Sequence, residues 1–402
     1  MSKWNTTNLK DADCFEYLNG LWKGKKPPFE KAVVIRNTNF RDDGILDLQN
    51  VAVLDVESRQ LENRRLKKGD IIIERSGGGP KQPVGRVCFF DIENSQPHSF
   101  SNFTTTLRVK DTNTYLPLFV HYYLLHLYNT GFTIPLQRAT TGIRNLDFAT
   151  YQQAEVPKPP KLEQRRIVAV LWKVQRAIET EDKLIATVRE LKQSAMHKLF
   201  THGVGNESQK ETEIGKVPAS WELKQFDGFA TLQRGQDLTR SSFRDGPIPV
   251  VGATRIIGYH DTANVKGPGV TVVRSGSSAG KPLYIKNDFW AHNVVLYVKD
   301  FHGNLPLFVY YKICNLELQQ FRSGVAVPTL NRNTFSSEIL AVPLLHEQQE
   351  IANILETVDR NIEVHERKRA ILQDLFKTLL HNLMTGEICV ADLDIDVTEV
   401  KS

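Results

Sequence analysis

The sequence is poor in sulfur, with four cysteines and three methionines among 402 residues. No two of the cysteines lie at the close spacing that zinc ligands need; they are Cys14, Cys88, Cys314 and Cys389. So few cysteines in a chain of this length do not make a disulfide framework. They are typical of unpaired thiols in a reducing compartment.

The sequence also lacks a hydrophobic run that could span a membrane. The longest apolar run, residues 115–128, is shorter than the ~20 residues that a span requires, and it contains His121 and His126. The first residues, MSKWNTTNLKDADCF, carry no apolar core of a secretory signal. Hydrophobic residues make up 41% of the chain and charged residues 24%, which is typical of a soluble globular protein. We therefore predict a cytoplasmic protein without membrane contact.

Catalytic motifs are missing as well. The 11 histidines form no His-x-His or His-x-x-x-His pair. Residues 276–282, GSSAGKP, imitate a phosphate-binding loop, but one residue is missing between the glycines and Pro282 stands where a Mg²⁺-binding Ser or Thr belongs. They predict a tight turn between two strands. The tripeptide 181–183, EDK, imitates half of a nuclease motif without a partnering acid, and it predicts a solvated helix face.

The sequence also lacks the parts of an adenine methyltransferase. It has neither an Asn/Asp-Pro-Pro-aromatic tetrad nor a glycine-rich strand–turn–helix loop for a cofactor. We therefore predict no catalytic, cofactor-binding or metal-binding residues in this chain. A DNA methyltransferase or nuclease with unrecognised motifs remains one alternative.

What the sequence does have is a long internal repeat. Residues 163–201 and 347–385 align without a gap at an offset of 184 residues, and prolines precede both segments while Gly203 and Gly386 follow them. Apolar residues recur at alternating intervals of three and four, the pattern of a long helix that buries one seam against another helix. The predicted helix-pairing residues are Ile167, Leu171, Val174 and Ile178 in the first copy and Ile351, Leu355, Val358 and Ile362 in the second.

The two predicted helices occupy equivalent points of a duplicated chain, so a pseudo-twofold axis would pair them antiparallel. The alternative is that each helix covers only its own globular segment. Polar residues interrupt both apolar stripes, and such positions fix the register of a helix pair; they are Glu181, Lys192, His365 and Arg369.

The globular segments that precede the two helices are related too. Residues 69–77 and 269–276 both form a strand candidate that ends in Arg-Ser-Gly, and residues 116–122 and 305–311 both begin Leu-Pro-Leu-Phe-Val. Residues 138–146 are echoed by residues 322–330. The rest diverges, so the sequence predicts an α+β tandem: two mixed α/β domains with a shared scaffold and different loops, each followed by a long helix.

The loops of both segments combine arginine and lysine with small polar and aromatic residues. These basic side chains can neutralise phosphates, and arginine can also read guanine edges. The candidate DNA-binding residues are Lys23, Lys25, Lys26, Arg36, Arg75, Lys81, Arg138 and Arg144 in the first segment and Arg234, Arg240, Arg274, Lys281, Arg322 and Arg332 in the second, with Arg41, Arg244 and Arg255 beside them. The alternative for any one of them is an ordinary surface charge.

The pattern resembles the DNA-specificity subunit of type I restriction–modification systems over nearly the full length of the chain. The resemblance rests on the proline–Glu-Gln–helix motifs at 156–167 and 342–351, on Gly386-Glu387 after the last helix, and on the Gly-x-x-Pro-x-x-Trp motif at 215–221, of which the first segment has no clear copy. It implies two target recognition domains separated by two antiparallel helices, each domain reading half of a bipartite, asymmetric DNA site.

The resemblance also implies partners and boundaries. The expected partners are double-stranded DNA, two methylation subunits and, through them, two restriction subunits; S-adenosylmethionine, ATP and Mg²⁺ belong to those partners. The expected boundaries are 1–157 for the first recognition domain, 158–203 for the first helix, 204–216 for a linker, 217–344 for the second domain, 345–386 for the second helix and 387–402 for a solvated acidic tail. A coiled-coil scaffold that binds only protein is the second alternative.

Overall fold

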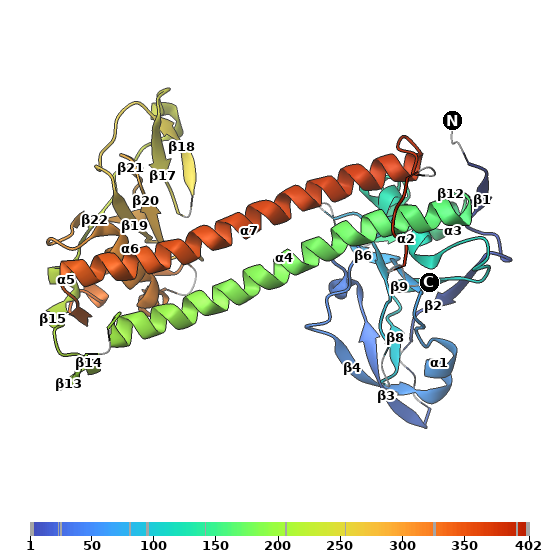
Figure 1. Cartoon of the computed structure of the whole chain (residues 1–402), viewed down its shortest axis with the longest axis horizontal. Helices are drawn as coiled ribbons and strands as arrows, with labels where there is room; N and C mark the ends of the chain where they lie inside the picture. The colour runs from blue at the N-terminus through green and yellow to red at the C-terminus, as the bar shows by residue number, and fades with distance from the viewer. Residues whose placement is uncertain are drawn as a thin grey trace. The chain divides into compact units, whose positions relative to one another are not determined.

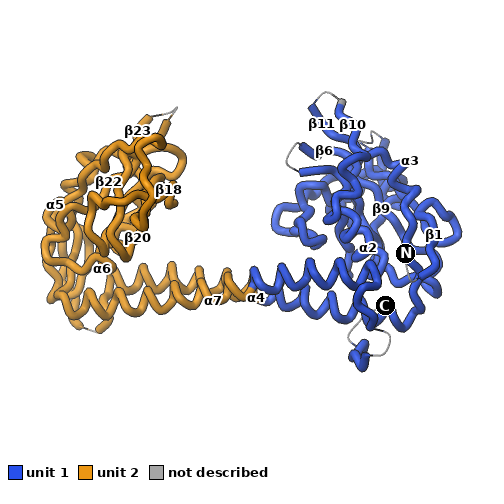
Figure 2. The backbone as a smooth tube through the Cα atoms, turned by 90° about the horizontal axis from the view of Figure 1, so that it is seen from above, with its two compact units in different colours: residues 1–180, 369–402 blue, residues 181–368 orange. Residues whose placement is uncertain are grey.

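The structure is a computed structural model. It describes residues 4–22, 24, 26–79, 82–93, 96–140, 142–205, 207–253, 255–324, 327–390 and 393–398. The chain divides into two compact units, of which unit 1 comprises residues 1–180 and 369–402 and unit 2 comprises residues 181–368 (Figure 2). Each unit is described below by itself.

Unit 1 is a mixed α/β domain with two main sheets (Figure 1). The first sheet has the strand order β2-β9-β5-β7 and the second has the order β4-β3-β8, while β10-β11-β6 and β1-β12 form smaller sheets. The elements are β1 (Thr6–Asn8), β2 (Phe15–Asn19), β3 (Phe29–Ile35), β4 (Ala52–Glu57), α1 (Ser58–Asn63), β5 (Ile71–Glu74), β6 (Ser76–Gly78), β7 (Val87–Phe89), β8 (His98–Phe100), β9 (Thr104–Val109), α2 (Pro117–Asn129), β10 (Gln137–Thr140), β11 (Ile143–Leu146), α3 (Phe148–Tyr151) and β12 (Glu155–Pro157).

Unit 2 repeats the topology of both main sheets. Its first sheet has the order β16-β22-β19-β20 and its second the order β18-β17-β21, with the short hairpin β23-β24 and the pair β15-β25. The elements are β13 (Gln209–Thr212), β14 (Gly215–Pro218), β15 (Glu222–Gln225), α5 (Phe226–Phe229), β16 (Thr231–Arg234), β17 (Ile248–Val251), β18 (Ile256–His260), β19 (Gly269–Val273), β20 (Pro282–Ile285), β21 (Trp290–Ala291), β22 (Val295–Asp300), α6 (Pro306–Asn315), β23 (Arg322–Ser323), β24 (Thr329–Leu330) and β25 (Ile339–Val342). The prediction of a duplicated α+β fold is therefore confirmed.

The central strand of each first sheet explains why these segments fold alike. All four residues of β5 and all five of β19 are buried. Such strands are covered on both faces, which their β-branched composition suits. In unit 1 the covering residues come from α2 and from the first half of α4 (Lys161–His202); in unit 2 they come from α6 and from the start of α7 (Leu345–Thr385). Each long helix thus contributes its N-terminal turns to the core of the domain that precedes it.

A buried glutamine ties each long helix to its domain. In unit 1 the Leu116 N–H donates to Gln164 Oε1 at 2.9 Å, and Gln164 Nε2 donates to the Thr114 carbonyl at 2.8 Å. In unit 2 the Leu305 N–H donates to Gln348 Oε1 at 3.0 Å. These bonds satisfy backbone groups at the start of α2 and α6 that lack partners within the helix. They give the Glu-Gln pair of the repeat a structural role.

The glutamate of the same Glu-Gln pair accepts a hydrogen bond from a tryptophan side chain. Trp221 Nε1 donates to Glu347 Oε2 at 2.8 Å in unit 2, and Trp4 Nε1 donates to Glu163 Oε2 at 3.1 Å in unit 1. Trp4 also lies against Gly386, where an added Cβ would be 3.3 Å from its ring. Trp4 therefore takes the place of Trp221, although its sequence context carries no Gly-x-x-Pro-x-x-Trp motif.

The two long helices run antiparallel. In unit 2, Glu181 of α4 contacts His365 of α7 at 2.7 Å, while Lys192 Nζ, further along α4, lies 2.5 Å from Asp359 Oδ1, which is earlier in α7. In unit 1, Cys389 Sγ, just beyond α7, lies 3.7 Å from Glu163 Oε1 in the first turn of α4. The predicted antiparallel pairing is thus confirmed, and the alternative of helices that only cover their own segments is wrong.

Glu181 corrects one prediction. It is buried, not solvated, because its carboxylate accepts from His365 Nδ1 at 2.7 Å and pairs with Lys368 Nζ at 2.6 Å. The His365 position is also the equivalent of Glu181 in the repeat, 184 residues later. A residue meets its own counterpart only at the middle of an antiparallel pair of equivalent helices. The cluster therefore marks that midpoint.

Three further expectations need correction. Residues 204–216 are not only a polar linker, because β13 and β14 pair there as a hairpin. The polar character of residues 137–145 predicts a loop, but Gln137–Thr140 and Ile143–Leu146 pair as the hairpin β10–β11. In the C-terminal tail Val390 is buried and Ile395 packs against the unit 1 core, so that part of the tail is not solvated. Within the described residues, no helix has the length and apolar character of a membrane span.

Candidate nucleic-acid interface

The candidate interface of unit 1 lies where β2 and β5 end. Both strands pair antiparallel with β9, so their C-terminal ends meet at one edge of the sheet. Asn19 ends β2 and Arg75 follows β5. The hairpin β10–β11 joins this edge because Arg144 pairs with Gly78 of β6 and the Leu146 N–H donates to the Arg75 carbonyl at 2.8 Å. The edge and hairpin lie away from the α4 and α7 segments of this unit (Figure 2).

A glycine in each domain allows two backbone segments to approach each other closely at this edge of the sheet. A Cβ on Gly20 would lie 1.9 Å from the Ser101 carbonyl oxygen, and one on Gly235 would lie 2.3 Å from the His292 carbonyl oxygen in unit 2. Only a residue without Cβ permits such an approach. Gly20 follows β2 and Gly235 follows β16, so both domains use the same device to start their first variable loop.

Arg75 is held in place by two contacts. Its Nη1 donates to Asn19 Oδ1 at 3.2 Å, and its guanidinium carbon lies 4.5 Å from the centre of the Phe148 ring. Burial lowers the pKa of Arg75, yet the side chain stays charged because an arginine pKa is far above neutral pH. Stacking on an aromatic ring presents the guanidinium fork in a fixed orientation.

A buried network that the sequence did not single out supports the adjoining loop. Arg86 donates to both Glu74 carboxylate oxygens, at 2.9 and 2.8 Å, and to the carbonyls of Asn37 and Phe40. Asn37 in turn donates to Glu74 Oε1 and to the Ser76 carbonyl, each at 3.2 Å. The network fixes the start of β6 through the bond from Asn37 to Ser76. Arg86 was missed because its partners lie 12 to 49 residues away.

The hairpin carries two of the predicted cations. Arg138 is exposed and pairs with Asp147 at 2.5 Å, and Arg144 Nη1 donates to Gln137 Oε1 at 3.3 Å. Both lie on the strands that join the Arg75 edge. The structure therefore brings together Arg75, Arg138 and Arg144, which are 6 to 69 residues apart in the sequence.

Unit 2 builds the same edge from different side chains. The Leu330 N–H donates to the Arg274 carbonyl at 2.7 Å, as Leu146 does to Arg75. Arg234 ends β16, in the position of Asn19, and its Nε donates to the Asn293 carbonyl at 3.2 Å. Arg234, Arg274 and Arg322 thus meet at the edge of the second domain.

The hairpin register differs from the predicted correspondence by one residue. Leu146 pairs with Gln137 and Leu330 pairs with Arg322, so Arg322 corresponds to Gln137, not to Arg138. At this position both side chains retain buried donors without a partner, Gln137 Nε2 and Arg322 Nε and Nη2. An unsatisfied buried donor is costly, and an incoming acceptor would relieve that cost.

The remaining predicted cations are spread over each domain. In unit 1, Lys26 is exposed and Arg36 Nη2 donates to the Asn50 carbonyl at 3.2 Å; Arg41 pairs with Asp43 at 2.6 Å. Lys23, Lys25 and Lys81 lie outside the described residues. In unit 2, Arg332 Nη1 donates to the Leu232 carbonyl at 2.8 Å and Arg244 pairs with Asp261 at 3.1 Å; Arg240, Arg255 and Lys281 are exposed.

The predicted helix-pairing residues lie mostly in the cores. Those of the first copy, Ile167, Leu171, Val174 and Ile178, are buried or half-buried in the unit 1 core beside α7 residues such as Phe376. Ile351 and Leu355 are buried in the unit 2 core, and Val358 and Ile362 are half-buried. Burial suits the pairing role, which remains a prediction for the individual residues.

Both edges carry groups that could bind a nucleic acid. Arginine forks, amides and hydroxyls offer donors to phosphate oxygens and base edges. Among the described residues, no group of three or more histidine, cysteine or acidic side chains could hold a metal ion. Residues 276–280 form the predicted turn between β19 and β20.

Comparison with known proteins gives a consistent result. The family model described as "Type I restriction modification DNA specificity domain" matches residues 1–190 and 218–373. The chain is 22% identical to the putative type I restriction enzyme MjaX specificity subunit of Methanocaldococcus jannaschii, covering 96% of this chain and 94% of that one. It is 26% identical to the MjaVIII specificity subunit of the same organism, over 64% and 68% of the two chains.

Solved structures share the fold. The S subunit of a type I restriction–modification system from M. genitalium superposes with a TM-score of 0.62 at 17% identity, covering 95% of this chain and 96% of that one. A chain from a study of complex assembly and conformational transition of the type I system gives a TM-score of 0.53 at 13% identity, covering 93% and 98%.

Proposed function

We propose that this chain, which belongs to the family of type I restriction–modification DNA specificity subunits, reads a bipartite, asymmetric DNA target. Each α/β domain binds one half of the target through the edge at which Arg75 or Arg274 lies. The two long helices set the spacing between the half-sites and dock two methylation subunits, through which restriction subunits join. The chain itself is not catalytic; the chemistry belongs to its partners.

One observation carries this proposal: the two domains share a strand order but differ in the side chains at the same edge. A common scaffold with Asn19, Gln137 and Arg75 on one side and Arg234, Arg322 and Arg274 on the other suits two readers of unlike sequences. Amides pair in a fork with adenine and arginines with guanine. The first domain therefore has the means to prefer different bases from the second.

The helices supply the spacing. A continuous helix of 42 residues extends roughly 60 Å at 1.5 Å per residue. One turn of B-DNA measures about 34–36 Å. A pair of such helices is therefore long enough to serve two half-sites about one helical turn apart.

The proposal is tested by exchanging one domain. Residues 217–344 are replaced by the corresponding domain of another specificity subunit, and methylated adenines are mapped by sequencing DNA from cells that carry the cognate methylation subunit. One half-site should change while the other half-site and the spacer stay the same. A change in both half-sites would contradict the modular assignment.

Two simpler assays separate the alternatives. The purified chain alone, incubated with DNA and labelled S-adenosylmethionine, should transfer no label; turnover would favour an enzyme with unrecognised motifs. The complex with its methylation subunit should bind DNA with an affinity that falls steeply as salt rises. Binding that is independent of DNA would favour a protein-binding scaffold.

A further inference from the structure

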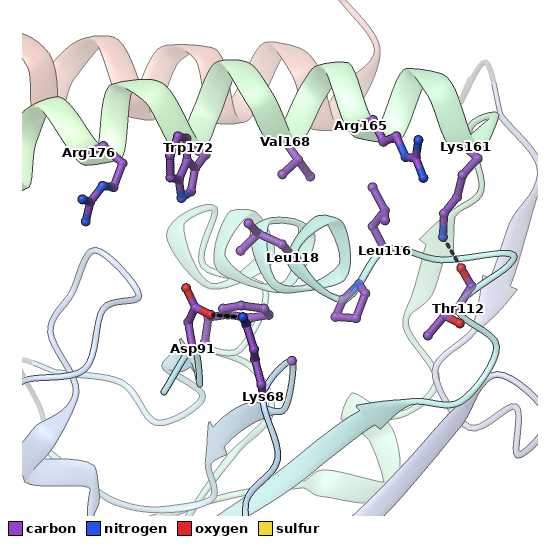
Figure 3. Close-up of a pocket in the computed structure, with 13 residues that line it drawn as sticks. Lys68, Asp91, Thr112, Leu116, Leu118, Lys161, Arg165, Val168, Trp172 and Arg176 are labelled. Carbon is purple, nitrogen blue, oxygen red and sulfur yellow. Dashed lines mark hydrogen bonds and ion pairs between the residues drawn. The ribbon is translucent and has the colours of Figure 1, made fainter. Parts of the chain in front are cut away.

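A pocket of about 590 Å³ lies in unit 1 between the first half of α4 and the start of α2 (Figure 3). One face of α4 lines it, because the lining residues are spaced three or four apart; they are Lys161, Arg165, Val168, Trp172 and Arg176. Opposite them lie Leu116, Pro117 and Leu118, with Lys68, Phe89 and Asp91 along one side. The pocket is distinct from the arginine edge, which lies away from the long helices (Figure 2).

The pocket carries an excess of positive charge at one end, where Lys161 and Arg165 lie and where the carboxylate of Asp111 offsets only part of that charge. Among the described residues Arg165 makes no ion pair or hydrogen bond, and Lys161 donates only to the Thr112 carbonyl. Burial and the neighbouring charge of Arg165 lower the pKa of Lys161, and the carboxylate of Asp111 opposes this change. By contrast, Lys68 is neutralised by Glu93 at 2.5 Å and Asp91 at 3.6 Å, and Arg176 by Glu179 at 2.8 Å. A carboxylate from a partner is therefore favoured beside Arg165 and Lys161, where two cations face one acid, rather than beside Lys68 or Arg176.

The middle of the pocket is apolar. Trp172 is only half-buried, and it lies beside Val168 and across from Leu118 (Figure 3). A large aromatic ring that is partly open to solvent next to other apolar side chains is a typical anchor point for a partner side chain. A DNA backbone would use the cations and leave this apolar floor uncovered, so a protein segment fits the pocket better.

The repeat does not preserve this pocket. The positions 184 residues later are Leu345, Gln349, Ala352, Glu356 and Arg360, so Trp172 is replaced by an acid and both unpaired cations are lost. The buried neighbours are kept, since Gln164 matches Gln348 and Leu171 matches Leu355. The scaffold is thus duplicated, whereas the open face of α4 has a chemistry of its own.

We infer that this pocket docks an acidic segment of one methylation subunit, with an apolar side chain of that segment seated on Trp172 and a carboxylate between Lys161 and Arg165. This inference rests on the proposed function. Because α7 offers no equivalent pocket chemistry, the two methylation subunits bind the chain with unequal affinity, and the tighter one binds at unit 1.

The test is a titration of the full chain with its cognate methylation subunit, followed by calorimetry and native mass spectrometry. The unmodified chain should bind two copies in two resolved steps. Arg165→Glu and Trp172→Ala should each weaken the tighter step by on the order of tenfold or more, and leave the weaker step unchanged. Gln349→Glu, the matched change on α7, should leave the tighter step unchanged. Arg165 is exposed, so Arg165→Glu should keep the circular dichroism spectrum of the folded chain.

Tryptophan fluorescence emission provides a second measurement of docking. Docking should shift the emission of the unmodified chain, and Trp172→Phe should remove most of that shift while keeping binding within a few-fold. Unchanged affinities for both steps in Arg165→Glu and Trp172→Ala would overturn the inference. A second contradicting result is that Arg165→Glu lowers the DNA affinity of the chain alone and leaves the binding of the methylation subunit intact. That result would make the pocket a phosphate site. Failure of the unmodified chain to bind the subunit at all would instead overturn the docking role proposed for the helices.

Discussion

At the scale of single residues, the most specific prediction about base recognition concerns Arg322. It occupies the hairpin position of Gln137, and its Nε and Nη2 have no acceptor among the described residues. Arg322→Ala should weaken binding of the complex to its target by about 1–3 kcal/mol and relax the sequence preference at one position. Arg360→Ala, an exposed arginine on α7, is the control and should change neither. Affinities are measured at fixed salt on a panel of single-base variants; equal losses on all of them would assign Arg322 to a phosphate.

The buried side chain of Lys312 should make the stability of unit 2 depend on pH. Its ammonium group is buried between the rings of Phe200, at 5.0 Å, and Trp221, at 5.8 Å, and burial lowers its pKa to about 8. The folded chain therefore binds fewer protons than the unfolded chain between about pH 8 and the ordinary lysine value of 10.5. The free energy of unfolding should rise with pH in that window, and the cost of the buried charge is fully present below it.

Lys312→Met should remove this rise and stabilise unit 2 at pH 7 by on the order of 2 kcal/mol. A change of one in pKa corresponds to about 1.4 kcal/mol, and the ring contacts offset part of the cost of the buried charge. Urea unfolding from pH 7 to 10.5 provides the measurement. Lys299→Met, at an exposed position of β22, is the control and should keep the rise. A rise of the same size in Lys312→Met would show that other groups cause it.

At the scale of elements, the buried Glu181 cluster fixes the register of α4 against α7. Glu181→Gln weakens its bonds to His365 and Lys368, so the unfolding free energy should fall by about 1–3 kcal/mol. Glu190→Gln, at an exposed position of α4, should change it by less than about 0.5 kcal/mol. Urea denaturation of the two variants provides the comparison, and equal midpoints would deny the cluster a structural role.

The same Glu181 cluster predicts how the stability of the folded chain changes at low pH. Hydrogen bonds from Lys368 and His365 hold the pKa of Glu181 below the ordinary value of 4.5. A carboxyl with a depressed pKa stabilises the folded chain above its unfolded pKa, and that stability is lost as the pH falls through the folded value. Glu181→Gln should therefore flatten the acid limb of the stability curve and leave the limb above pH 7 unchanged.

The sequence predicted the long helices and their pairing because a repeated apolar stripe is a local pattern. It did not predict that Glu181 is buried, because its partner His365 is 184 residues away. It missed the hairpin β10–β11, since polar residues such as Gln137 and Arg138 are strand formers only when a neighbour such as β6 pairs with them. Trp4 was missed because its role is defined by its bond to Glu163, not by the residues around it.

The candidate site was predictable to a smaller extent. Arg75 and Arg274 could be matched from the Arg-Ser-Gly ends of two similar strands. The correspondence of Arg322 with Gln137 could not be predicted. The second hairpin is one residue shorter than the first, so an alignment that matches Leu330 with Leu146 places Arg322 opposite Arg138, whereas the strand pairing places it opposite Gln137. Gln137, Asn19 and Arg86 carry no sequence signal that separates them from ordinary polar residues.

At the scale of the whole molecule, the proposed function makes the chain two sequence readers joined by a spacer. The two domains repeat one topology with different side chains at the arginine edge, and the helices pair through register-fixing contacts at their middle. The half-site sequences should therefore depend on the domains alone and the spacer length on the helices alone.

The most direct test is to shorten both helices by one heptad at facing positions and to map methylated adenines in cells that carry the cognate methylation subunit. One heptad shortens a helix by about 10 Å, or roughly three base pairs of DNA. The account predicts the same two half-sites with a shorter spacer. The original spacer retained by an active variant, or altered half-sites, would contradict it.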